Sequence, residues 1–327
     1  MAFADRDLGT TYQTPPGSTA KTISAMAAFM KHGTAAQKIT HRWQSSEGID
    51  GADRSAGGRD IDIREGLRAS LNPFFVKLVN EGDGLYKELN KIYYSVGIGV
   101  MMTQKEDHKA AAFNENLLKK APYKCFTPYY FSRKQTATSQ TEFNQVMRVR
   151  EELALGEYRR IMKSPKRVPL NNTFFAMPWG QGAMRATPLN IARAYSAIVN
   201  GGNYMPTRYT MSEKVNPIKL MDEASANILW DDLVNASKLP KFQKISFGGK
   251  TGTPERGVSK AVFTKRIGAK GDRKNDSWYA FVVKSSKGSN LAVVLRIERT
   301  KKTSSEAREW VENMVMPILK EAGYVNY

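Results

Sequence analysis

The chain has 327 residues and a formal net charge of +19, with 41% hydrophobic and 25% charged residues. This length allows one large domain or two small ones with a buried core, and no apolar run approaches the ~20 residues that a membrane-spanning helix needs. The single cysteine, Cys125, excludes an internal disulfide and a cysteine metal cluster. The three histidines lack metal-ligand spacing, so we expect neither a metal nor another cofactor.

The basic residues are concentrated in two stretches. Residues 238–302 contain 17 Lys/Arg against 4 Asp/Glu, and residues 109–170 contain 13 against 5. A basic surface attracts polyanions such as an anionic membrane or an acidic wall polymer, or it serves only to keep the protein soluble. Because no zinc-finger or RNP-type string accompanies the charge, nucleic acid is not an expected partner.

The first predicted helix begins at Ser18, after the Thr-Pro-Pro-Gly turn of residues 14–17, and ends at Gly33. Ser18 and Lys21 then share one face of its first turn. A lysine amine can take the proton of a serine nucleophile, and a helix N-terminus offers backbone N–H groups to a developing oxyanion. The alternative is an ordinary N-cap serine beside an exposed lysine.

The second chemically interesting stretch lies on a turn between two predicted helices. Residues 62–69 look helical, and residues 73–79 form a second helix with Pro73 at its first position. Ser70 and Asn72 lie on the tight turn between them, where alternate side chains can point the same way. The alternative is that Asn72 merely caps the second helix.

The middle of the chain reads mainly as helices. Residues 103–170 carry mixed helical signals, such as 143–162, and no catalytic constellation. Further on, Thr187 is the predicted N-cap of a helix with Pro188 at its first position. Another helix is predicted over residues 222–236.

The pattern changes to strands near residue 244. Residues 244–247 read as a short strand, followed by Gly-Gly-Lys-Thr-Gly-Thr at 248–253, which offers one cation, two hydroxyls and backbone that a ligand can approach. Residues 277–283 and 291–297 predict an antiparallel hairpin. Helices followed by an antiparallel sheet indicate an α+β fold.

The residue pattern of the C-terminal segment predicts one more helix. Thr303 and Glu306 are spaced as a capping box, and apolar residues follow at helical spacing from Ala307 to Ile318.

Three motifs in this order resemble the penicillin-binding proteins and serine β-lactamases. They are the S-x-x-K of residues 18–21, the S-x-N of residues 70–72 and the K-T-G-T of residues 250–253. Two further stretches, residues 180–202 with G-Q-G, T-P-L and N-G-G, and the aromatic strand from Ser277, resemble penicillin-binding protein transpeptidase domains. The resemblance extends from residue 12 to about residue 320.

The resemblance implies an α+β fold in which an antiparallel, roughly five-stranded sheet is flanked by helices and joined to a helical subdomain. By this comparison, residues 1–40 and 185–327 would form the sheet-containing subdomain, and residues 41–184 the mainly helical one. The cleft between them would hold the active site.

The resemblance also implies roles for the motif residues. Ser18 would attack the carbonyl of the penultimate D-alanine in a stem peptide ending in D-Ala-D-Ala, and Lys21 would take its proton. Ser70 and Lys250 would help to pass a proton to the leaving D-alanine, and Asn72 would hold the substrate amide.

The K-T-G-T stretch would bind the substrate's end. The Thr251 and Thr253 hydroxyls with Lys250 would bind the terminal carboxylate, Gly252 would let the backbone approach the substrate, and the N–H groups of Ser18 and Thr253 would form the oxyanion hole.

The implied activity is that of a peptidoglycan D,D-transpeptidase, which crosslinks stem peptides through a serine acyl-enzyme and is acylated by β-lactam antibiotics. Such domains act outside the cytoplasm, in the periplasm or at the outer face of the membrane. The family usually carries a membrane anchor and an N-terminal domain, but only seventeen residues precede Ser18. We therefore expect a soluble fragment of a membrane-anchored protein.

Other functions remain open at this point. A D,D-carboxypeptidase uses the same motifs. A β-lactamase of class A would have aspartate in place of Leu71 and a supporting glutamate on a following loop. A non-catalytic β-lactam sensor or peptidoglycan-binding module would acylate without turnover or not at all, and in a polyanion-binding protein the motif matches would be accidental.

Overall fold

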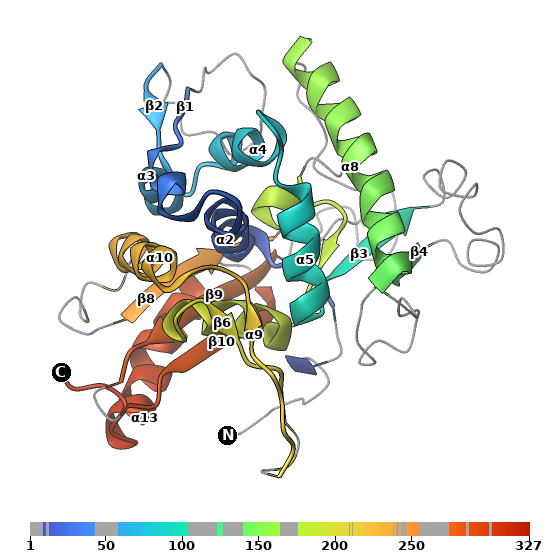
Figure 1. Cartoon of the computed structure of the whole chain (residues 1–327). Coiled ribbons are helices and arrows are strands. Elements are labelled where there is room, and N and C mark those ends of the chain that lie inside the picture. The colour runs from blue at the N-terminus through green and yellow to red at the C-terminus, as the bar shows by residue number, and fades with distance from the viewer. Residues whose placement is uncertain are drawn as a thin grey trace, which may run out of the picture.

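The structure is a computed structural model, shown in Figure 1. The residues that it describes are 9–10, 13–42, 58–103, 123–126, 140–163, 176–208, 210, 212–237, 239, 242, 247–254, 275–285, 288–300 and 303–327. The helices and helical turns in this part are η1 (Gly17–Thr19), α2 (Ala20–His32), η2 (Gly33–Lys38), α3 (Ile63–Arg68), α4 (Asn72–Asn80), α5 (Tyr86–Val96), α8 (Gln140–Lys163), η5 (Met177–Trp179), α9 (Pro188–Val199), α10 (Glu223–Ala236), α12 (Ser305–Trp310), the π-helical turn η7 (Val311–Val315) and α13 (Met316–Glu321). The strands are β1 (His41–Arg42), β2 (Asp60–Ile61), β3 (Gly99–Thr103), β4 (Tyr123–Phe126), β5 (Met184–Arg185), β6 (Asn203–Tyr204), β7 (Ile218–Lys219), β8 (Phe247–Gly252), β9 (Asn275–Val283) and β10 (Leu291–Thr300).

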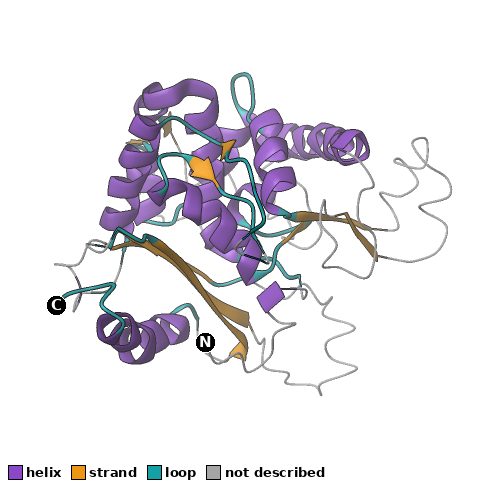
Figure 2. Cartoon of the chain, turned by 60° about the horizontal axis from the view of Figure 1, so that its bottom comes forward, coloured by secondary structure: helices purple, strands orange, loops and turns teal. Residues whose placement is uncertain are grey.

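The main sheet is antiparallel, with strand order β10-β9-β8. Because side chains alternate along a strand, β9 supplies two cores. Trp278, Ala280 and Val282 pack into the cluster formed with α2, α9 and α10, whereas Phe281 and Val283 pack against the C-terminal helices. Figure 2 shows the sheet between these two layers of helices.

Helix α2 lies at the centre of the larger helical layer. It contacts α4, α5, α9, α10 and η5, and residues 20–29 are all buried. A helix that is buried on all sides carries mostly apolar or small residues around its whole circumference, and the alanine-rich sequence of α2 fits this rule. The polar side chains of α2 therefore need partners inside the protein.

The smaller sheets are also antiparallel. Strands β4, β3 and β5 form one sheet, and β1 with β2 and β6 with β7 form two short ribbons. Thr14 and Ala186 pair in an isolated bridge, which attaches the segment before η1 to the end of β5.

The α+β class is confirmed, although the main sheet has three strands within the described residues rather than about five. The predicted helices in the middle of the chain are confirmed as α8, α9 and α10, with Thr187 capping α9 through a complete capping box. The predicted hairpin is confirmed as β9 and β10. The division into two subdomains stays a prediction.

The predicted position of the K-T-G stretch is wrong. Lys250, Thr251 and Gly252 belong to strand β8 itself and pair with β9 as far as Trp278, instead of following a strand. Residues 244–246, the start of the predicted strand, lie outside the described residues. The glycine-rich sequence suggests a turn, but close packing against neighbouring backbone requires the same glycines.

The predicted capping box at Thr303 and Glu306 is wrong. The N-cap of α12 is Ser304, with no side-chain cap bond, and the Thr300 hydroxyl donates to the Glu306 carboxylate instead. The C-terminal helix is also interrupted by the π-helical turn η7. Among the described residues, no helix is both long and apolar enough to cross a membrane.

Gly180 lies where two segments meet through their backbones. Its carbonyl accepts a hydrogen bond of 2.9 Å from the Gly17 N–H, and its φ is +79°. A Cβ at this position would overlap the Gly17 carbonyl oxygen. The first glycine of the G-Q-G motif is therefore required by both its backbone angle and the proximity of η1.

We expect Gly180→Ala to lower the free energy of unfolding by roughly 2 kcal/mol or more, because strain and a backbone clash act together. Urea denaturation measures this. The matched control is Gly156→Ala, on α8 with open space around its Cβ position, where alanine should stabilise the helix by up to about 1 kcal/mol. Equal stability of both variants would show that the protein tolerates a side chain between Gly180 and Gly17.

Glu81, the C-cap of α4, lies in a polar cluster. Its carboxylate contacts His41 Nδ1 at 2.8 Å and accepts a hydrogen bond from the Tyr158 hydroxyl at 2.5 Å. The hydrogen bond from His41, with a smaller contribution from Tyr158, lowers the pKa of Glu81 to about 2 despite partial burial. The cluster thus attaches β1 and α8 to the end of α4.

Because the folded-state pKa lies below the unfolded value of 4.5, this interaction stabilises the fold above pH 4.5 and is lost as the pH falls toward about 2. Glu81→Gln should therefore lose stability less steeply than the original chain between these two pH values. Denaturation midpoints at several pH values measure the slopes. Glu321→Gln, an exposed change on α13, is the control, and identical slopes for Glu81→Gln and the original chain would refute the prediction.

Candidate active site

Ser18 lies in the helical turn η1, directly before α2. It is half-buried, and Lys21, one turn later, is fully buried. The N-cap of α2 is Thr19, whose hydroxyl donates to the Pro16 carbonyl instead of capping the helix. The alternative of a capping Ser18 beside an exposed lysine is therefore wrong.

The hydroxyl of Ser70 joins two buried lysines. Lys21 Nζ lies 3.0 Å from Ser70 Oγ and Lys250 Nζ lies 2.9 Å from the same atom. Lys21 Nζ also donates to the Ser70 carbonyl oxygen at 2.5 Å and lies 5.9 Å from the centre of the Phe75 ring. Residues that are far apart in the sequence thus converge on one oxygen atom.

Ser70 adopts an uncommon backbone conformation. Its φ is +57°, and no other non-glycine residue in the described part of the chain has a positive φ. Such a conformation is unfavourable for an L-residue, and it persists only where the surrounding contacts determine it. The turn between α3 and α4 thereby directs both the side chain and the carbonyl of Ser70 toward Lys21.

Asn72 is the first residue of α4. The N-cap is Leu71, and it makes no side-chain cap bond, so the alternative in which Asn72 caps this helix is wrong. Its position two residues after Ser70 is the one that the S-x-N spacing predicts.

The end of β8 adjoins η1. A Cβ on Gly252 would lie 2.6 Å from the Pro16 carbonyl oxygen and 3.3 Å from the Ser18 nitrogen. A Cβ on Gly17 would likewise lie 3.0 Å from the Thr253 nitrogen. The backbones that carry Ser18 and Thr253 are therefore neighbours, and glycine at both contact points allows the approach.

The threonines of the K-T-G-T stretch differ in surroundings. Thr253 Oγ1 accepts a hydrogen bond of 2.8 Å from the Ser304 N–H, and the Thr251 carbonyl lies 3.3 Å from Lys250 Nζ. Thr251 and Thr253 are both half-buried, whereas Lys250 is 4% exposed.

Several supporting residues are not identifiable from the sequence. The Tyr195 hydroxyl lies 2.8 Å from Thr22 Oγ1 and donates to the Thr19 carbonyl at 2.9 Å, which holds the first turn of α2. Ser237 Oγ accepts a bond of 2.7 Å from the Gly249 N–H, beside Lys250. The sequence does not show what Tyr195 contacts, because hydropathy does not reveal the partner of a buried hydroxyl.

Burial raises the pKa of Tyr195 above its usual value, and it does the same for Tyr279 on β9. Both side chains are therefore neutral. Among the described residues, His, Cys, Asp and Glu side chains do not gather in a group of three or more that could hold a metal ion.

Comparison with known proteins identifies a family for this chain. The family model described as the penicillin binding protein transpeptidase domain matches residues 4–317. No curated protein sequence matches the chain.

Solved structures share the fold at low sequence identity. The transpeptidase domain of Burkholderia pseudomallei penicillin-binding protein 3 is 16% identical with a TM-score of 0.54, and the match covers 90% of this chain and 74% of that one. A peptidoglycan glycosyltransferase from Burkholderia ambifaria is 14% identical with a TM-score of 0.55, covering 92% and 76%. Pseudomonas aeruginosa PBP2 is 14% identical with a TM-score of 0.57, covering 98% and 64%.

The family model spans nearly the whole sequence, and the similar structures have the same fold. This chain belongs to the family of penicillin-binding protein transpeptidase domains.

Proposed function

We propose that the chain is a peptidoglycan D,D-transpeptidase that forms an acyl-enzyme on Ser18. Membership in the family already assigns it to transpeptidase-type reactions of peptidoglycan synthesis. The observation that carries the finer proposal is the Ser70 hydroxyl shared by Lys21 and Lys250, with Lys21 one helical turn from Ser18. A serine one helical turn from a buried amine, which shares a hydroxyl with a second buried amine, is equipped for acyl transfer.

In the first half-reaction, Ser18 Oγ attacks the carbonyl of the penultimate D-alanine, and its proton passes to the amine of Lys21. The N–H groups of Ser18 and Thr253 stabilise the oxyanion, a role supported by the proximity of their backbones. The C–N bond then breaks, and the leaving D-alanine amine receives a proton through Ser70.

The two lysines have distinct electrostatic roles in this proposal. Two ammonium ions that share one buried oxygen would repel one another, so the arrangement favours one amine in its neutral form. A neutral Lys21 can accept the Ser18 proton, while a charged Lys250 attracts the substrate's terminal carboxylate. The Ser70 hydroxyl between the two amines lets the proton that Lys21 has accepted pass on to the leaving D-alanine amine.

The K-T-G-T stretch is proposed to bind this carboxylate through Lys250, Thr251 and Thr253, with Gly252 allowing close approach. Because Thr253 Oγ1 already accepts from the Ser304 N–H, its own hydrogen can be donated to a ligand. Asn72 is proposed to hold the substrate amide.

In the second half-reaction, an amine from a neighbouring stem peptide attacks the acyl-enzyme and forms the crosslink. A β-lactam acylates Ser18 in the same way, and its adduct persists. We further propose that the domain works outside the cytoplasm as part of a membrane-anchored protein, with its basic surface facing an anionic membrane or wall polymer.

A fluorescent penicillin should form a covalent adduct with the original chain that Ser18→Ala abolishes, because the attacking oxygen is then absent. Intact-mass spectrometry over time measures the adduct, which should persist for many minutes. Ser196→Ala is a matched control, since that hydroxyl bonds to the Arg193 carbonyl of its own helix, and it should acylate normally.

Absence of an adduct on the folded original chain would refute the proposal. Rapid release of hydrolysed drug would instead indicate a β-lactamase. With a D-Ala-D-Ala peptide and an acceptor amine, hydrolysis without crosslinked product would indicate a carboxypeptidase.

Replacements of Ser70 should separate backbone strain from chemistry. Ser70→Ala keeps the positive φ and loses the hydroxyl, whereas Ser70→Gly also relieves the backbone, so the glycine variant should be more stable by roughly 1 kcal/mol. Both variants should lose most of the acylation rate. Denaturation and adduct kinetics measure these effects, and normal acylation by Ser70→Gly would exclude the hydroxyl from the proton path.

A further inference from the structure

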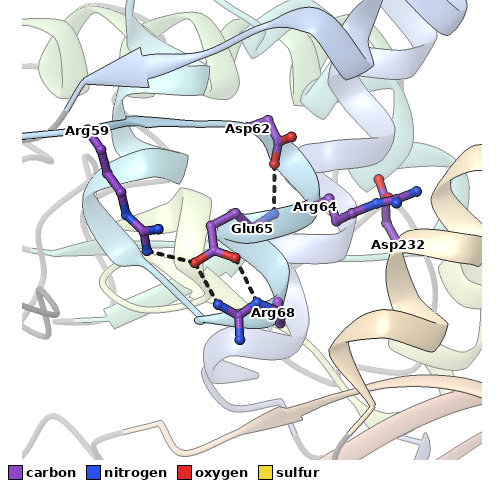
Figure 3. A network of polar contacts seen from close by, with 6 residues as sticks. All are labelled: Arg59, Asp62, Arg64, Glu65, Arg68 and Asp232. Atoms are coloured by element: carbon purple, nitrogen blue, oxygen red, sulfur yellow. Dashed lines mark hydrogen bonds and ion pairs between the residues drawn. The ribbon is translucent and has the colours of Figure 1, made fainter. Parts of the chain in front are cut away.

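An ion pair outside the group of site residues crosses from α3 to α10. Arg64 Nε donates to Asp232 Oδ1 at 2.7 Å, and α3 packs directly on α10. Figure 3 shows Arg64 extended toward Asp232, whereas Glu65 points away from α10 and lies between Arg59 and Arg68. The Arg64–Asp232 pair is therefore the contact in this network that joins two separate elements.

The α10 end of the pair is attached to the strand that carries Lys250. A Cβ on Gly248 would lie 2.9 Å from Leu233 Cβ, so the helix and β8 are in close contact one residue after Asp232. One turn later, Ser237 Oγ holds the Gly249 N–H at 2.7 Å. A displacement of α10 would thus be transmitted to β8.

The α3 end is attached to the turn that carries Ser70. Backbone bonds run from the Ala69 N–H to the Glu65 carbonyl and from the Leu71 N–H to the Gly66 carbonyl. A Cβ on Gly66 would lie 2.5 Å from the Phe74 ring, so α3 and α4 pack tightly on both sides of this turn. The position of Ser70 consequently follows the position of α3.

A gain in the stability of the fold is a poor explanation for the Arg64–Asp232 pair. Asp232 is fully buried, its Oδ2 atom has no hydrogen-bond partner among the described residues, and Arg64 is partly exposed. Burial raises the pKa of Asp232, only partly offset by Arg64. When the folded-state pKa of a carboxyl is raised, the fold loses stability as the pH rises from the unfolded-state pKa through the folded-state pKa. The ionised Asp232 is therefore unfavourable for the fold at neutral pH. Buried ion pairs are often no more stabilising than apolar replacements.

We propose that Arg64 and Asp232 are a positioning pair that keeps Ser70 Oγ within hydrogen-bonding distance of Lys250 Nζ. This inference rests on the proposed function, because it assigns the pair an effect on Ser18 acylation. The pair spans the same junction as the Lys250–Ser70 bond, and it restrains two elements that the polypeptide chain does not connect directly. Neither residue is among the groups that we propose to contact the substrate.

The test compares replacement of the whole pair with a conservative change. The double variant Arg64→Met/Asp232→Leu removes the bridge and leaves no unpaired buried charge, whereas Asp232→Asn retains an oxygen that can accept from Arg64 Nε. Saturation kinetics of penicillin adduct formation give the acylation rate constant and the dissociation constant separately.

We expect the double variant to keep its Tm while its acylation rate constant falls between roughly 10-fold and 100-fold, as small misplacements of catalytic groups do. The dissociation constant for penicillin should change little, and the pH profile of acylation should shift because the Lys250–Ser70 link is altered. Asp232→Asn should acylate at nearly the original rate.

Two controls separate positioning from loss of stability. Glu65→Gln breaks the ion pairs with Arg59 and Arg68, which lie within residues 59–68 and do not bridge to α10, and it should leave acylation unchanged. Leu319→Ala lowers stability in the cluster on the far side of the sheet, and it should also leave acylation unchanged. Normal acylation by the double variant, or equal slowing in either control, would overturn the proposal.

A crystal structure of the double variant completes the test. The Lys250 Nζ to Ser70 Oγ distance should exceed hydrogen-bonding range, and an unchanged distance would overturn the inference even if no β-lactam reacts. Failure of the original chain to form any adduct would instead refute the proposed function, so the two failures can be told apart.

Discussion

The structure depends on one shared hydrogen-bonding group, the hydroxyl of Ser70. Lys21 reaches it from the first turn of a buried helix, and Lys250 reaches it from strand β8. A buried lysine amine is unfavourable unless it has polar partners, so this oxygen is a constraint that α2, the α3–α4 turn and β8 share. The uncommon backbone conformation of Ser70 is consistent with that requirement.

Close backbone approach makes this convergence possible. Gly180 adjoins Gly17, and Gly252 adjoins the backbone of Pro16 and Ser18, at distances that no side chain would permit. These contacts bring η1 against η5 on one side and against β8 on the other. The glycines of the motifs therefore act mainly through their lack of a side chain, and the catalytic candidates depend on them indirectly.

Polar groups away from the site have structural and positional consequences that hydrophobic packing does not supply. Tyr195 holds the first turn of α2, His41 and Tyr158 surround Glu81 at the end of α4, and Arg64 bridges α3 to Asp232. The contacts of Glu81 hold β1 and α8 at the end of α4. The bridge from Arg64 instead aligns two elements across the site.

The sequence by itself determined the local features of this protein: a helix that ends before Gly33, although α2 begins at Ala20 and not at the predicted Ser18, the capping of α9 by Thr187 and the β9–β10 hairpin. It also supplied the candidate residues Ser18, Lys21, Ser70, Asn72 and Lys250. Periodicity, capping and turn chemistry act over a few residues, and motif order carried the family resemblance. Only the tertiary structure decided that Lys250 lies within a strand, that Lys21 is buried and that Arg64 meets Asp232. These features depend on contacts between residues far apart in the sequence, because the burial of a charged side chain is set by the elements that pack around it.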